Sequence, residues 1–123
     1  MERRVLIVED DEKLRALIAR VVRIGGWTPL TAANGERACA LLDLEVSPHV
    51  IVLDLLMPLM NGWQFRACQL ANPHWAPIPV VVLSGAHHGE RAMQVAAVIP
   101  KPFPFDQLLL TLHRVTTDDH MRP

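Results

Sequence analysis

Acidic residues close two of the short apolar runs in this sequence. Glu9 and Asp10 follow the run that starts at Arg4, and Asp54 ends the run in HVIVLDLLMP, where Pro58 stops any regular element. A lone Asp at such a position usually caps the next turn. If the fold brings these carboxylates together, the repulsion between each pair costs about 3 kcal/mol at ~5 Å and an effective dielectric of ~20. A cation would be needed to offset this repulsion. Few oxygen ligands with room for water favour Mg²⁺ over Ca²⁺.

A hydroxyl and an ammonium end two further apolar runs. Ser84 closes VVVLS, and Lys101 follows Val98–Pro100. A carboxylate such as Asp54 can attack phosphorus and form an aspartyl phosphate. That transfer needs in-line positioning and neutralised oxygens, which a metal, an ammonium and a hydroxyl would supply. Lys101 is one of two lysines beside ten arginines, which indicates a need for a compact charge. The alternative is a solvated lysine that precedes a helix.

The periodicity of the apolar residues places these polar groups at strand ends. The expected strands are Arg4–Val8, Trp27–Ala32, the run ending at Asp54, Val80–Ser84 and Val98–Pro100. The first three helices are expected from Glu12 to Gly25-Gly26, from Asn34-Gly35 to before Ser47-Pro48, and from Asn61-Gly62 to about Ala71. A short fourth helix with Met93 and Ala96 is expected after the loop Gly85–Gly89. The last helix is expected to follow Pro102 and Pro104. The polar tail Thr116–Pro123 is expected to fray.

The inward faces of these helices follow from the same spacing. The residues expected to be buried are Leu14, Leu17, Ile18, Val21 and Val22 in the first helix, Ala38, Leu41 and Leu42 in the second, Phe65 and Cys68 in the third, and Phe105, Leu108, Leu109 and Leu112 in the last. Five repeats of strand and helix predict an α/β fold with a doubly wound parallel sheet.

Proline positions predict the order of the strands. Proline cannot donate to a ladder, so it is confined to sheet edges, and only the second and fifth strands contain one, Pro29 and Pro100. Two edges and three interior strands fit the order 2-1-3-4-5. In that order the first and third strands are neighbours, so Glu9, Asp10 and Asp54 converge.

Composition limits the possible functions. The 123 residues predict a single domain, 1–123, with a core of about 4–116. The net charge of −1 argues against nucleic acid and anionic membranes as partners, and no signal peptide or membrane span is expected. Cys39 and Cys68 are interpreted as buried, reduced thiols of a cytosolic protein, and the six histidines show no zinc spacing.

Four sequence blocks resemble one known family. VLIVEDDEKLR, VIVLDLLMPLMNG, PVVVLSGA and PKPF, in that order, resemble the blocks of response-regulator receiver domains of two-component systems, over Val5–Val115. The resemblance implies a flavodoxin-like receiver fold, and the chain resembles a stand-alone chemotaxis-type receiver. It also implies the following roles: Asp54 as phosphoacceptor, Glu9 and Asp10 as the acidic pair with Asp10 on the metal, the Leu56 backbone carbonyl on Mg²⁺, Ser84 and Lys101 on the phosphoryl group, and a cis peptide bond before Pro102.

The resemblance also implies a mode of action. The expected donor is a histidine kinase or phosphotransfer protein, the output is contact with an unidentified downstream protein, and the location is the cytoplasm. The chain would catalyse only its own phosphorylation and dephosphorylation, so it is not otherwise an enzyme. Two departures affect the output surface: Val98 stands where receivers place an aromatic switch residue, and the segment from Ser84 to Lys101 is short, which predicts a shortened fourth helix. A monomer is therefore expected.

Three alternatives remain. The chain could be a receiver-like interaction module that is not phosphorylated, or a receiver excised from a hybrid kinase or a larger regulator. An enzyme of another class is the third. No G-x-G-x-x-G follows the first strand, which argues against a nucleotide-dependent oxidoreductase, and an aspartate-nucleophile phosphatase would need an acid where Leu56 stands.

Overall fold

The structure is a computed structural model that describes residues 2–44, 47–85 and 94–120. A five-stranded parallel sheet forms its centre, with the strand order β2-β1-β3-β4-β5. The elements are β1 (Arg4–Val8), α1 (Glu12–Ile24), β2 (Thr28–Ala32), α2 (Gly35–Asp43), β3 (Val50–Asp54), α3 (Gly62–Ala71), β4 (Val80–Ser84), β5 (Ala97–Pro100) and α4 (Phe105–His120). The predicted fold class and strand order are confirmed, with Pro29 and Pro100 in the two edge strands.

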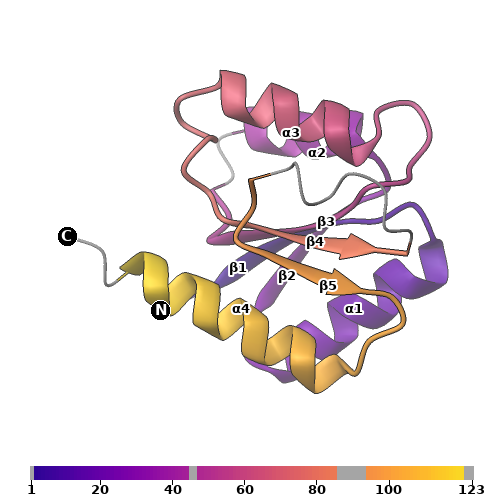
Figure 1. Cartoon of the computed structure of the whole chain (residues 1–123), viewed down its shortest axis with the longest axis vertical. Helices are drawn as coiled ribbons and strands as arrows, with labels where there is room; N and C mark the ends of the chain where they lie inside the picture. The colour runs from indigo at the N-terminus through magenta and orange to yellow at the C-terminus, as the bar shows by residue number, and fades with distance from the viewer. Residues whose placement is uncertain (1, 45–46, 86–93, 121–123) are drawn as a thin grey trace.

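Helices cover both faces of the sheet. Figure 1 shows α1 and α4 on one face and α2 and α3 on the other. Alternate residues of β1 point into two separate cores: Val5 and Ile7 pack with α1 and α4, and Leu6 and Val8 pack with α2 and α3. All five residues of β3 and of β4 are buried, because these strands have neighbours on both sides and helices on both faces.

Polar residues begin each of the first three helices. Asp11, Asn34 and Asn61 accept a hydrogen bond from the backbone N–H three residues later, and Gln64 completes a capping box with Asn61. Gly25 ends α1, as the Gly25-Gly26 pair predicts. The peptide bond between Lys101 and Pro102 is cis, as expected.

Several local expectations differ from the structure. Leu17 is 43% exposed instead of buried, because the inward face of α1 is narrow and is filled by Ile18 and Val22. Ala96 lies in a bend before β5 and not in a helix, while Met93 and most of the predicted short fourth helix lie outside the described residues.

The prediction that the tail frays from Thr116 onward is wrong for the first part of the tail. α4 continues through His120, beyond the predicted boundary at Thr116. Val115 is buried in the core, and the Thr116 hydroxyl donates to the Leu112 carbonyl at 2.8 Å while it accepts from Arg3 at 3.0 Å. These contacts satisfy polar groups that would otherwise favour fraying. Among the described residues, no helix is long and apolar enough to cross a membrane.

The loop after β3 is packed closely against the start of α3. The Gly62 N–H donates to the Leu55 carbonyl at 2.9 Å, and a Cβ atom at Gly62 would lie 2.7 Å from both the Asp54 carbonyl oxygen and Leu55 Cα. Because these neighbours are backbone atoms, they could give way only if the strand end moved.

We therefore expect Gly62→Ala to lower the free energy of unfolding by about 1–3 kcal/mol, as overpacking does. Gly85→Ala is the matched control, since its Cβ would meet only Lys101 Cδ at 3.9 Å; its effect should stay within about 0.5 kcal/mol. Urea denaturation of both variants measures the difference. Equal stabilities would show that the end of β3 is not constrained by this contact.

Candidate functional site

Three carboxylates meet at the carboxyl ends of β1 and β3. One oxygen each of Glu9, Asp10 and Asp54 lies within 4.8 Å of the others, as the strand order predicts. Glu9 and Asp54 are only 1% and 5% exposed, whereas Asp10 is open to solvent. Hard oxygen donors that are partly open to water suit a divalent cation such as Mg²⁺. The residues present therefore fit the metal that the sequence predicts.

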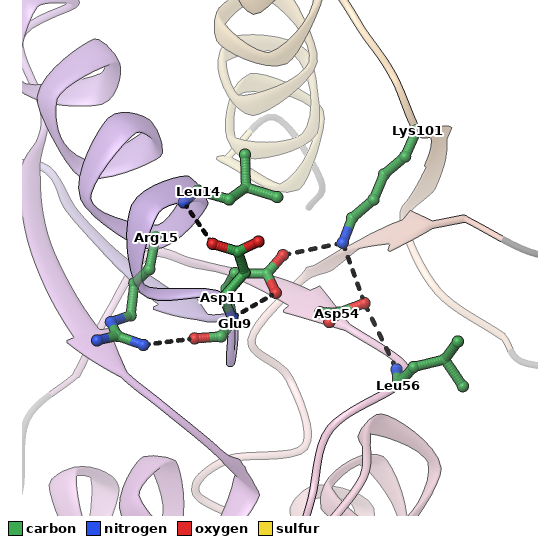
Figure 2. Close-up of polar contacts among 7 residues, drawn as sticks. All are labelled: Glu9, Asp11, Leu14, Arg15, Asp54, Leu56 and Lys101. Atoms are coloured by element: carbon green, nitrogen blue, oxygen red, sulfur yellow. Dashed lines mark hydrogen bonds and ion pairs between the residues drawn. The ribbon is translucent and has the colours of Figure 1, made fainter.

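Lys101 joins two of these carboxylates. It reaches them from the segment after β5, across the end of β4, and Figure 2 shows its ammonium between Glu9 and Asp54. The Lys101 Nζ lies 2.9 Å from Glu9 Oε1 and 3.4 Å from Asp54 Oδ1. The ammonium is thus held directly beside the predicted nucleophile. The predicted placement of Lys101 is confirmed by these contacts.

Burial changes the protonation of this cluster. Desolvation raises the pKa of Glu9 to about 7, with the hydrogen bond from Lys101 opposing the rise and Asp54 adding to it. Desolvation alone would lower the pKa of Lys101, but Glu9 and Asp54 outweigh it and the pKa is raised. Lys101 therefore remains a cation at neutral pH, while Glu9 titrates there.

Backbone and side-chain donors fix the position of Glu9. The Asp11 N–H donates to Glu9 Oε2 at 3.2 Å, and the Glu9 N–H donates to the Ala32 carbonyl at 3.1 Å. Arg15 in α1 donates to the Glu9 carbonyl at 2.9 Å (Figure 2). The sequence pattern does not predict the contacts that Asp11 and Arg15 make with Glu9. An Asp just before the helical pattern was a usable capping signal, whereas nothing in the pattern marked Arg15.

The loop that follows Asp54 is partly open to solvent, because Leu56 and Leu59 are exposed while Leu55 and Met57 are buried. The Leu56 N–H lies 3.4 Å from Asp54 Oδ1, and the Leu56 side chain is 68% exposed. Leu59 has a φ of 65°, a conformation that non-glycine residues adopt rarely. The metal-binding role of the Leu56 carbonyl stays a prediction.

Ser84 lies at the same edge of the sheet. It is a buried residue at the end of β4, and its carbonyl accepts a hydrogen bond from the Lys101 N–H at 2.7 Å. This bond ties the end of β4 to the residue whose side chain reaches Asp54. The edge therefore gathers three carboxylates that could hold a metal, one of them the predicted nucleophile, together with a cation and a hydroxyl-bearing residue, and this set matches the needs of phosphoryl transfer.

Comparison with known proteins gives the same picture. The protein-family model for the response regulator receiver domain matches residues 5–113. The response regulator MprA of Mycolicibacterium vanbaalenii is 32% identical, over 94% of this chain and 53% of its own length. The transcriptional regulatory protein TcrA of Mycobacterium tuberculosis is 30% identical, over 92% of this chain and 46% of its own length. The chain thus spans about half the length of these curated relatives.

Solved structures share the fold. The chemotaxis protein CheY4 of Vibrio cholerae has a TM-score of 0.84 and 28% identity, covering 94% of this chain and 99% of that chain. A sensor protein from Polaromonas sp. JS666 has a TM-score of 0.88 at 22% identity, covering 97% and 99% of the two chains. The second likeness supports the fold alone.

The raised pKa of Glu9 predicts a pH-dependent stability in metal-free buffer. The folded protein holds a proton on Glu9 up to a pKa of about 7, whereas an ordinary glutamate has a value of 4.5. The free energy of unfolding should therefore fall as the pH rises through this window. As the pH rises from 4.5 to about 7, we expect the melting temperature of wild type to fall relative to that of Glu9→Gln.

Melting curves in a chelating buffer test this expectation. The exposed Glu36→Gln variant is the control for loss of one negative charge. If the difference between wild type and Glu9→Gln did not change with pH, Glu9 would not titrate in this range.

Proposed function

The chain belongs to the family of response regulator receiver domains, and we propose that it accepts a phosphoryl group on Asp54 in a two-component phosphorelay. One observation carries the proposal. The buried Asp54 carboxylate lies 3.4 Å from the Lys101 ammonium and beside Glu9 and Asp10. A carboxylate in such a setting has the cation and the metal-binding groups that a phosphoryl acceptor needs.

In the proposed reaction, a carboxylate oxygen of Asp54 forms a bond to phosphorus as the bond to the donor's leaving group breaks. Mg²⁺ held by Glu9, Asp10, Asp54 and the Leu56 carbonyl would neutralise charge on the reacting oxygens. The Lys101 ammonium then moves from the carboxylates to contact the phosphoryl oxygens. The Ser84 hydroxyl donates a hydrogen bond to the same phosphoryl group. The chain would catalyse this step and the later hydrolysis, and no other reaction.

The donor in this proposal is a histidine kinase or a phosphotransfer protein. Receivers of response regulators work with such partners, and a downstream protein would read the phosphorylated face. Under this proposal the chain acts in the cytoplasm, where such donors phosphorylate their receivers. A non-phosphorylated interaction module is the second candidate, but it gives no reason for a partly buried Lys101 that contacts two carboxylates.

The output surface sets this chain apart from the family pattern. Val98 lies on the edge strand β5 and is 41% exposed. A valine has no ring to turn inward and little freedom at χ1. We propose that the change caused by phosphorylation stays near the loops after β3 and β4, and that the chain remains a monomer.

The proposal predicts which residue accepts the phosphoryl group. Incubation with acetyl phosphate and Mg²⁺ should add one phosphoryl group at Asp54, and removal of Mg²⁺ with a chelator should abolish the addition, because the carboxylates then repel the anionic donor. Borohydride trapping and mass spectrometry locate the site. Asp54→Asn should reduce labelling to background, while Asp43→Asn, at the exposed end of α2, should label like wild type. Wild-type labelling of Asp54→Asn would refute the assignment.

The proposal also predicts that Lys101 acts on the phosphoryl group and not on the metal. Lys101→Ala removes a cation that competes with Mg²⁺, so Mg²⁺ affinity should stay equal or rise slightly, while phosphorylation by acetyl phosphate should slow. A Mg²⁺ titration followed by tryptophan fluorescence, with Trp63 as the expected reporter among the three tryptophans, measures the first effect. Lys13→Ala removes the other lysine, which is exposed on α1, and is the control.

A loss of about tenfold in Mg²⁺ affinity in Lys101→Ala, about 1.4 kcal/mol, would contradict this role. Lys101 would then support the structure of the acidic site and would not act on the phosphoryl group.

A further inference from the structure

The two cysteines lie next to each other on neighbouring helices. Cys39 is in the middle of α2 and Cys68 is near the end of α3, and Figure 1 shows the two helices side by side on one face of the sheet. Their sulfur atoms are 3.6 Å apart, within reach of a thiol hydrogen bond. Both residues are free thiols and both are half-buried, not fully buried as the sequence suggests. Twenty-eight residues separate them in the chain.

We propose that Cys39 and Cys68 are a modification site, which a low-molecular-weight disulfide oxidises to an intramolecular disulfide. A disulfide needs sulfur atoms at about 2.05 Å, so the two atoms must approach by about 1.5 Å. Rotation of the two side chains on helices that already pack together can supply much of this movement. Both residues are also half-buried, which makes them more accessible to a small oxidant than fully buried structural thiols, which are inert.

The surroundings of the pair suggest the order of the steps. Burial raises the pKa of the Cys39 thiol to about 12, and the neighbouring Cys68 and Asp43 add to the rise. Cys39 therefore keeps its proton at neutral pH, and the proposal assigns the first attack to the other thiol, Cys68. The Cys68 sulfur loses its proton and attacks one sulfur of the oxidant, which forms a mixed disulfide and releases one thiolate.

The second step closes the bond within the protein. Cys39 gives up its proton, and its sulfur attacks the Cys68 sulfur and releases the second thiol. In total the protein loses two hydrogen atoms and the small disulfide becomes two thiols, so no further oxidant is needed. Formation of the mixed disulfide also removes the Cys68 thiol that raises the pKa of Cys39, which helps this step.

The bond would tie together two helices that flank the loop after Asp54. The Gly35 N–H at the start of α2 donates to the Met60 carbonyl at 3.1 Å, and the Gly62 N–H at the start of α3 donates to the Leu55 carbonyl at 2.9 Å. Both helices thus hold the same loop from two sides. A covalent link between them also restricts the unfolded chain, which predicts a higher melting temperature for the oxidised protein.

Oxidised glutathione is the probe. The full chain is incubated with it, quenched with a thiol-alkylating reagent and weighed as an intact protein. Wild type should lose two hydrogen atoms, take up no alkylating reagent and no glutathione, and melt at a higher temperature. Dithiothreitol should reverse all of these changes. Cys39→Ser should stop at a glutathione adduct on Cys68, and Cys68→Ser should react far more slowly.

Three results would overturn the proposal. Wild type could remain fully alkylated, which would show that the thiols are structural. It could accumulate glutathione adducts like those of Cys39→Ser, which would show that the sulfurs cannot close. It could form disulfide-linked dimers on a non-reducing gel, which would place the bond between chains. Circular dichroism of both serine variants checks that they fold, so a failure to react is attributable to the missing sulfur.

Discussion

The contact of the Lys101 ammonium with Glu9 and Asp54 is the interaction on which the site depends. Two carboxylates that are almost completely buried would repel each other strongly, because little water is present to screen them. Lys101 lies 2.9 Å from one and 3.4 Å from the other, so it compensates both. Burial still raises the pKa of Glu9 to about 7, which shows that one cation does not balance the cluster fully.

The strand order makes this contact possible. β1 and β3 are neighbours, so Glu9 and Asp54 come from adjacent strand ends, while Lys101 follows β5 at the far edge. Its side chain must therefore reach across the end of β4, and the hydrogen bond from the Lys101 N–H to the Ser84 carbonyl anchors its backbone there. A long, unbranched side chain suits this reach better than the shorter side chains do. The apolar strands and their helices thus serve to bring distant segments to one edge.

The sequence was sufficient for the parts of the structure that follow local rules. Apolar runs gave the strands, Asn and Gly residues marked helix ends, and the positions of Pro29 and Pro100 indicated the edges, so the meeting of Glu9, Asp10 and Asp54 could be deduced. Contacts between distant side chains could not. Gln69 looks like a surface residue but is fully buried, because its amide donates to the carbonyls of Trp75 and Ile78 and closes the loop after α3.

The same limit applies to Arg15 and to the cysteines. Arg15 contacts the Glu9 carbonyl only because α1 packs beside β1, and the 3.6 Å between the sulfurs of Cys39 and Cys68 depends on how α2 lies against α3. Under the proposed function, the exchange of Lys101 from Glu9 to a phosphoryl group would leave a buried carboxylate without its cation. A metal at Glu9 and Asp10 would then have to compensate it. Under that proposal, metal binding and phosphorylation would be coupled, because the metal would replace the contact that Glu9 now makes with Lys101.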